Sequence, residues 1–107
     1  MTKNQSIYCK IINHLHGIES KVMEMEETES LQRRFDRMHS CFEELELHIH
    51  NPLNEQYDET RIDCEATIIG DSVDNLHVVE VIKPIIYNRI EGQNHILQRA
   101  VVIVESM

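Results

Sequence analysis

The sequence predicts an α+β protein in which an N-terminal helical hairpin is followed by a small all-β domain. Residues 1–50 contain one glycine and no proline and are rich in Glu, Leu, Met, Lys and Gln, a composition typical of helices. From Arg61 onward β-branched residues dominate and Gly- or Asn-containing segments separate them, which indicates strands joined by turns. Asn51-Pro52 marks the border, because proline cannot continue a helix and restricts the residue before it. We therefore predict a helical dimerisation region over 1–50 and a β-domain over 51–107.

Two apolar stripes run through the helical region, both with alternating steps of four and three residues. They do not share a phase, because continuing the first stripe would place Glu29, Gln32 and Asp36 on the apolar seam, where they are costly to bury. We therefore predict a helical hairpin that breaks within 26–30, with Thr28 or Ser30 as the second N-cap. One continuous helix with a phase slip is the alternative. The first stripe is Ile11, Leu15, Ile18, Val22 and Met25, and the second is Leu31, Phe35, Met38, Phe42, Leu45 and Ile49.

A hairpin with stripes this regular has more apolar surface than its own two helices can cover. Pairing with a second hairpin would bury that surface in a four-helix bundle. The sequence therefore predicts a homodimer. The predicted interface residues are Ile11, Leu15, Ile18, Val22, Leu31, Phe35, Met38, Phe42 and Leu45.

The second half shows the period of two that is typical of half-buried strands. Ile62, Cys64 and Ala66 alternate with polar residues, and apolar segments follow within 78–90 and 96–104. Gly92 is expected in a hairpin turn, and Pro84 is expected at a bend or sheet edge because proline lacks the amide hydrogen that a central strand needs.

Composition excludes several classes of partner. The chain has 107 residues and a formal net charge of −9, and a negative field repels nucleic-acid backbones and anionic membrane surfaces. No apolar run approaches the ~20 residues of a membrane-spanning helix, and residues 1–5 lack the features of a signal peptide. We expect a cytoplasmic protein that binds neither nucleic acid nor membrane.

The histidines and cysteines raise the possibility of metal binding or catalysis. In the pairs His14/His16 and His48/His50, the two side chains would point about 200° apart on a helix and could not share an ion. Cys9, Cys41 and Cys64 form no Cys-x-x-Cys pair, so we predict reduced and mostly buried thiols, no metal and no cofactor. No phosphate-binding glycine loop or hydrolase motif is present, and we expect no enzyme activity. A nucleophilic pairing of Cys64 with His77 and a metal or redox protein remain as alternatives.

Several segments resemble the GrpE family of nucleotide exchange factors. Residues 51–58, Asn-Pro-Leu-Asn-Glu-Gln-Tyr-Asp, resemble the family segment in which Pro precedes Gly-Glu, one residue and Phe-Asp. Residues 79–87 resemble the strand before the family's Lys-Gly-Tyr turn, and 96–104 resemble its terminal strand. Residues 12–15 are more loosely similar to an Asp-Asn-Leu segment of the preceding helix, and 31–49 occupy the place of the last bundle helix.

The resemblance implies a short homodimeric co-chaperone without the family's long N-terminal stalk. Its β-domain would dock on the ATPase domain of a DnaK-type chaperone, favour the open nucleotide cleft and release ADP. The alternative is a dimeric interaction or regulatory module of the same fold without exchange activity. It is credible because Ile85 and Gln98 depart from the family pattern, which has Gly and Arg at these two positions. The partner-contacting residues implied by the resemblance are Lys83, Pro84, Ile85, Ile86, Tyr87, Gln98 and Val104.

Overall fold

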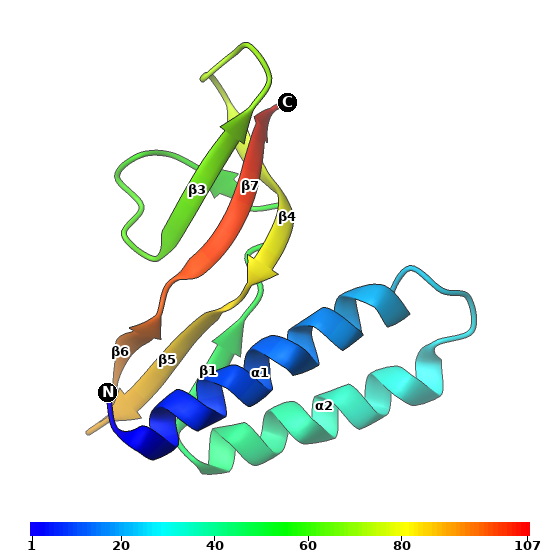
Figure 1. The fold of residues 1–107 in the computed structure, drawn as a ribbon, viewed down its shortest axis with the longest axis vertical. Coiled ribbons are helices and arrows are strands. Elements are labelled where there is room, and N and C mark those ends of the chain that lie inside the picture. Colours follow the sequence, from blue (N-terminus) through cyan, green and yellow to red (C-terminus); the bar gives the residue numbers. More distant parts are fainter.

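The computed structural model describes residues 1–107 and contains two helices followed by seven strands. Helices α1 (Lys3–Val22) and α2 (Glu29–Glu44) form an antiparallel hairpin beside the β region (Figure 1). This arrangement confirms the predicted α+β class. The strands are β1 (Leu47–His50), β2 (Gln56–Tyr57), β3 (Cys64–Ile69), β4 (Leu76–Lys83), β5 (Ile85–Ile90), β6 (Gln93–Gln98) and β7 (Ala100–Ser106).

The hairpin breaks where the change of phase predicts it. Helix α1 begins with a capping box, in which the Gln5 amide donates to Thr2 Oγ1 over 3.1 Å and the Thr2 amide donates to Gln5 Oε1 over 2.9 Å. The connection after α1 contains Glu27 in a left-handed conformation, with φ of 59°. Thr28 occupies the N-cap position of α2, although its side chain makes no capping hydrogen bond. The predicted hairpin is confirmed, and the single continuous helix is wrong.

The prediction that the helical region extends to residue 50 is wrong. Helix α2 ends at Glu44, Glu46 adopts a φ of 63°, and Leu47–His50 form strand β1, paired antiparallel with β5. In a strand, Leu47 and Ile49 share one face and pack on the same core, while His48 and His50 face the other way. The spacing of the apolar residues here fits the period of a helix as well as that of a strand, and pairing with β5 selects the strand.

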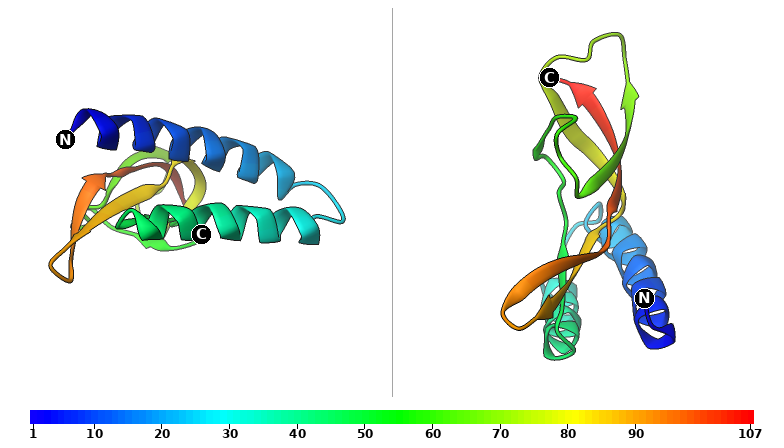
Figure 2. Two further views of the ribbon diagram at one scale, coloured as in Figure 1. Left: turned by 90° about the horizontal axis from the view of Figure 1, so that it is seen from below. Right: turned by 90° about the vertical axis from the view of Figure 1, so that its left-hand side faces the viewer.

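The strands form two sheets, with orders β1-β5-β6 and β2-β4-β7-β3, and only the β3–β7 pair is parallel. Pro84 lies where the chain passes from one sheet to the other, which confirms the predicted bend. Glu91 and Gly92 have φ of 51° and 79° and join β5 to β6, as a two-residue hairpin turn requires, so the turn at Gly92 is confirmed. Figure 2 shows the β5–β6 hairpin and both helices at the same end of the molecule, with the four-stranded sheet extending from them.

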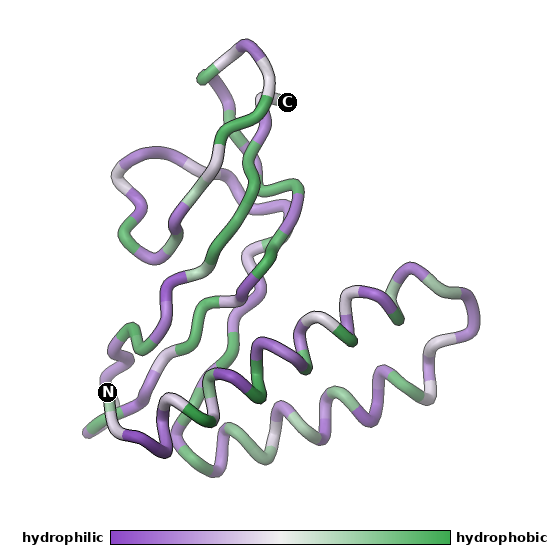
Figure 3. The backbone as a smooth tube through the Cα atoms, viewed as in Figure 1, coloured by the Kyte–Doolittle hydropathy of each residue, from purple (hydrophilic) through white to green (hydrophobic).

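The chain has two separate cores. One lies within the four-stranded sheet, where hydrophobic residues run along β7 (Figure 3). The other joins Cys9 and Ile12 of α1 to Leu47 and Ile86 of the three-stranded sheet. Ile85 belongs to the first core and its neighbour Ile86 to the second, so the two residues after Pro84 connect them. The members of the first core are Cys64, Leu76, Val78, Val81, Ile85, Ala100, Val102 and Val104.

The molecule is more open than a compact monomer of this mass. Its accessible surface is 7477 Å², compared with about 6,200 Å² expected for a compact folded chain of 12.6 kDa. Its radius of gyration is 14.8 Å, compared with about 13 Å expected for this length. The surplus surface exceeds the roughly 800 Å² that each partner buries in a standard protein–protein interface. A single copy therefore exposes enough surface for a stable association.

Candidate partner-binding surfaces

Four of the residues that the resemblance assigns to partner contact are buried inside the chain. Pro84, Ile85, Ile86 and Val104 are each less than 2% exposed. Ile85 and Val104 pack in the core of the four-stranded sheet, and Ile86 packs against α1. Their assignment as contact residues is therefore wrong for this conformation, because a partner cannot reach side chains that the protein's own core encloses.

Gln98 also has a structural role. Its side-chain amide donates to Asn13 Oδ1 over 2.8 Å and to the Pro84 carbonyl oxygen over 2.9 Å, while its carbonyl oxygen accepts from Asn13 Nδ2 over 2.9 Å. These bonds connect β6 to α1 and to the bend between the sheets. Because each polar atom of the Gln98 amide has a partner, this side chain holds α1 on the β region.

Lys83 and Tyr87 are the two assigned residues that reach the surface. Lys83 is exposed at the end of β4. Tyr87 is half-buried on β5, where its ring lies against the ring of His48 with centroids 6.2 Å apart and planes at 26°. Burial raises the pKa of the Tyr87 hydroxyl above its ordinary value, so the phenol stays neutral at physiological pH. Lys83 is thus the assigned residue best placed to contact a partner.

Lys83 belongs to an open face of the four-stranded sheet. Along β7, Ala100, Val102 and Val104 are buried, whereas Val101, Ile103 and Glu105 point to the opposite side. The strand registers place Lys83 and Glu65 beside Val101, and Glu80 and Thr67 beside Ile103. We call this set the outer sheet face. It combines an apolar centre with charged margins, a composition suited to binding another protein. Its residues are Glu65, Thr67, Ile69, Glu80, Lys83, Val101, Ile103 and Glu105.

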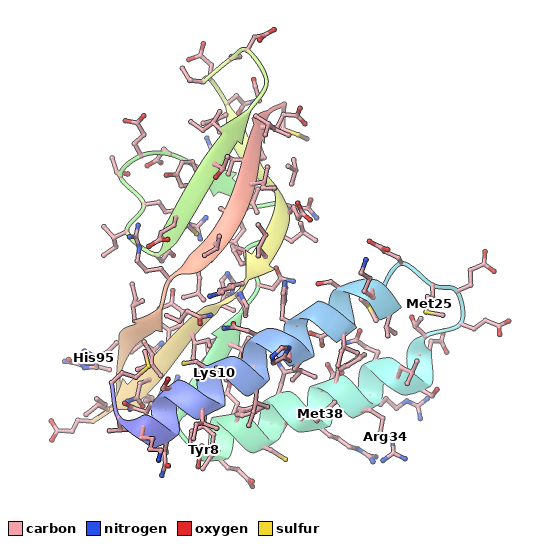
Figure 4. The ribbon with its side chains drawn as sticks, viewed as in Figure 1. Tyr8, Lys10, Met25, Arg34, Met38 and His95 are labelled. Atoms are coloured by element: carbon pink, nitrogen blue, oxygen red, sulfur yellow. The ribbon has the colours of Figure 1, made fainter.

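The helical hairpin has a second uncovered surface. Leu15 and Phe35, at 8% and 4% exposed, are buried within the single chain, and Val22 and Phe42 are half-buried. The remaining predicted interface residues are exposed, and a groove with a volume of about 490 Å³ lies between the two helices. We call this surface the hairpin face, and Figure 4 shows Met38 on α2 and Met25 in the connection beyond it. Its exposed apolar residues are Ile11, Ile18, Leu31, Met38 and Leu45.

The sequence interpretation missed the face by which α1 binds the β region. Cys9, Ile12 and His16 are buried, and they repeat at steps of three and four on the side of α1 opposite the exposed Ile11 and Ile18. The spacing of these residues was a usable signal. Because two of its three residues are a cysteine and a histidine, the stripe is hard to recognise from the apolar residues alone.

Glu19 and His39 connect the two helices within the hairpin. His39 Nε2 lies 3.2 Å from Glu19 Oε1, and the hydrogen bond to Glu19 is the main reason why the pKa of His39 is raised above its ordinary value of about 6.5. Asp36 and Glu43 on the same helix act in the same direction, while burial opposes them. The folded state therefore favours the protonated imidazole.

We expect this pair to make the stability of the hairpin depend on pH. Its contribution is complete below the ordinary histidine pKa of about 6.5 and is lost as the pH rises through the raised pKa of folded His39. A partly exposed pair of this kind contributes about 0.2–1 kcal/mol. Urea unfolding at pH 5.5 and pH 8 should show a smaller decrease in the free energy of unfolding for Glu19→Gln than for wild type. Equal decreases in the two proteins would contradict the assignment, since the other histidines are common to both.

A charged cluster fixes the loop between β2 and β3. Arg61 Nε donates to Asp63 Oδ1 over 2.7 Å, and Nη2 donates to Glu55 Oε1 over 2.9 Å. His50 Nε2 lies 2.6 Å from the other oxygen of Glu55. Arg61 holds the pKa of Asp63 below its usual range, and the pKa of Arg61 is raised in turn. These groups satisfy one another, so the cluster is explained as a support for the loop.

The geometry does not activate a cysteine as a nucleophile. Cys64 is 1% exposed in β3, and burial raises the pKa of its thiol to about 11. Burial also raises the pKa of Cys9. A thiol with a raised pKa is protonated at neutral pH and reacts slowly, which argues against the Cys64–His77 pairing. Cys9 and Cys64 are buried as predicted, whereas Cys41 is exposed.

His48 and His50 lie in strand β1 and not in the helix that was predicted, so their two side chains share a face. His48 Nδ1 lies 2.5 Å from Glu43 Oε1, and His50 is paired with Glu55. The chain has no group of three or more His, Cys, Asp or Glu side chains placed to hold a metal ion. One chain thus offers two imidazoles here, each already bonded to a carboxylate.

Comparison of the chain with protein families, with curated proteins and with solved structures finds no match. Neither helix has an apolar stretch long enough to cross a membrane. The fold and the exposed surfaces therefore provide the basis for a functional proposal: a helical hairpin and a small β region, each with an uncovered face of the kind that binds proteins.

Proposed function

We propose that the chain is a homodimer whose two hairpins pair through the hairpin face into a four-helix bundle. The exposed apolar residues of α1 and α2 support this proposal, because they lie on the side of the hairpin that the β region leaves uncovered. The surplus of accessible surface over that of a compact monomer supports it as well. A two-fold pairing would cover the same residues on both copies.

We further propose that the dimer is a co-chaperone of the GrpE type, which binds the ATPase domain of a DnaK-type chaperone and promotes the release of ADP. The observation that carries this proposal is the position of Lys83, which lies in a family-like segment and also on the outer sheet face. Exchange needs no catalytic group in this chain. The dimer would act by binding the open nucleotide cleft more tightly than the closed cleft, and this difference in affinity sets how far it can shift the chaperone toward release.

A second candidate is a dimeric interaction or regulatory module that binds a partner without promoting exchange. The burial of Pro84, Ile85, Ile86 and Val104 favours it, because those residues were the larger part of the contact set implied by the resemblance. The engagement of Gln98 with Asn13 favours it for the same reason. Both candidates use the outer sheet face, and they differ in whether the partner's nucleotide cleft responds.

Two measurements on the full chain separate these candidates. Release of labelled ADP from a DnaK-type ATPase domain should accelerate when wild type is added, and Lys83→Glu should weaken binding about tenfold, as expected for reversing a charge in a contact. Arg89→Glu is the control, because Arg89 is an exposed cation on the other sheet. Binding with unchanged release would favour the module without exchange. Absence of binding would contradict the co-chaperone candidate.

A further inference from the structure

A cleft separates the helical hairpin from β4. It shares Glu80 with the outer sheet face, and none of its lining residues belongs to the groove between the two helices. It lies between the C-terminal half of α1, the connection from β1 to β2, and the middle of β4, all of which Figure 1 shows at the junction of the hairpin and the β region. Its volume is about 590 Å³, within the range of ligand-binding clefts. The residues that line it include Met23, Leu53 and Val79 as well as several polar side chains.

Three of the four apolar residues that line this cleft are exposed, whereas Val81 is buried. Met23 and Leu53 are each 44% exposed, and Val79 is 38% exposed. Val79 lies at a break in the register between β4 and β7, where the bulge turns its side chain away from the sheet core. The three residues come from α1's C-cap, the loop before β2 and β4, so the fold gathers apolar groups that are far apart in the sequence.

Carboxylates dominate the charge of the cleft. Glu19, Glu24 and Glu80 line it, and no lysine or arginine does. The chain as a whole carries a formal net charge of −9, which strengthens the negative potential at this site. Such a cleft attracts cations and rejects anionic ligands.

His16 supplies an additional acceptor that has no partner within the chain. This side chain is 6% exposed and its Nε2 lies 2.7 Å from the Val81 carbonyl oxygen, so Nε2 carries the proton and donates. Nδ1 is then an acceptor, and no hydrogen bond of the chain reaches it. Because no enclosed side-chain nitrogen or oxygen lacks a partner, Nδ1 must be open to solvent. His16 lines the cleft, so this buried side chain forms part of its wall.

We propose that this cleft binds a basic, amphipathic peptide segment of a partner protein. Lysine or arginine side chains of the segment would donate to the Glu24 and Glu80 carboxylates, and its apolar side chains would cover Met23, Leu53 and Val79. The combination selects such a segment, because an anionic peptide would meet three carboxylates and a purely polar cation would leave the apolar surface exposed. The proposal does not depend on a DnaK-type partner.

The test uses the full chain and fluorescence anisotropy in 0.15 M salt. The probe is a labelled heptapeptide of alternating lysine and leucine, and the comparison peptides replace lysine with glutamate or leucine with glycine. We expect saturable binding of the lysine–leucine peptide and at least about tenfold weaker binding of both comparison peptides. Equal binding of the lysine–glycine peptide would overturn the peptide assignment in favour of a simple cation site.

Variants locate the binding. Glu24→Lys should weaken binding of the lysine–leucine peptide about tenfold, and Glu59→Lys, on the exposed loop after β2, should change it by less than about twofold. Both substitutions alter the net charge equally, so a general electrostatic attraction would affect them alike and would overturn the proposal. Amide NMR spectra of the wild-type chain provide an independent readout. Peptide-induced shifts should gather at Met23, Leu53 and Val79, and shifts confined to other residues, or no binding at all, would also overturn it.

Discussion

Replacing Ile86 with alanine should lower the free energy of unfolding by about 2–5 kcal/mol, a large part of the stability of a domain of this size. Ile86 is 0% exposed and packs with Cys9, Ile12 and Leu47 in the core that joins α1 to the three-stranded sheet. The substitution removes apolar contacts and leaves a cavity that this small core cannot easily fill. Urea denaturation followed by circular dichroism measures the change.

The matched control is Ile90→Ala on the same strand. Ile90 is exposed near the β5–β6 turn, so its replacement should change the free energy of unfolding by at most about 0.5 kcal/mol. The comparison also tests whether Ile86 contacts a partner, as the family resemblance implies. If Ile86→Ala retained wild-type stability and lost only partner binding, the assignment to the core would be refuted and the contact role restored.

The positions of Ile85 and Ile86 explain why the segment after Pro84 is sensitive. The chain leaves the four-stranded sheet at Pro84, and the next two side chains enter different cores because successive residues of a strand point to opposite faces. A motif that resembles a binding turn can therefore be a junction between cores. In this chain the apolar residues at the junction hold the hairpin and the β region together, while the exposed Lys83 just before it stays free for contact.

Much of the architecture could be predicted from local sequence signals. The change of phase near residues 26–30 predicts the helical hairpin, the Glu91-Gly92 pair matches a two-residue turn, and Pro84 matches the passage between sheets. Each of these features depends on residues that are close in sequence. Local chemistry is sufficient to specify them.

Other features depend on pairing between distant segments, and the sequence interpretation failed there. Residues 47–50 fit a helix or a strand, and only pairing with β5 selects the strand. The buried stripe of α1, which consists of Cys9, Ile12 and His16, can be recognised only once it is known that the β region packs on it. The same limit applies to the site, because the resemblance implies a contact segment but does not show which of its side chains the core encloses. The cleft could not be predicted from the sequence, because the segments that line it are far apart in the chain and share no local pattern.

The largest effect on assembly is expected from a charge on the hairpin face, and Ile18→Asp is the most informative variant. Ile18 is 58% exposed in the single chain, so the substitution should leave the fold of each copy intact. In the proposed dimer each Ile18 would be buried, and losing about 1.5–3 kcal/mol at both copies of a two-fold interface raises the dissociation constant at least about a hundredfold. Light scattering on a sizing column should then give half the wild-type mass.

Met38→Asp tests the same face from the opposite helix, and Val73→Asp serves as the control. Val73 is exposed in the loop before β4, where the same charge should not affect the mass. Phe35 is unsuitable for this experiment, because it is buried within one chain and a charge there would unfold the hairpin instead of separating copies. If wild type has the mass of one chain, or if both aspartate variants retain the mass of two, the hairpin face does not form the proposed interface. Its exposed apolar residues would then be available to a different protein, and the surplus surface of the chain would have to be covered by that partner.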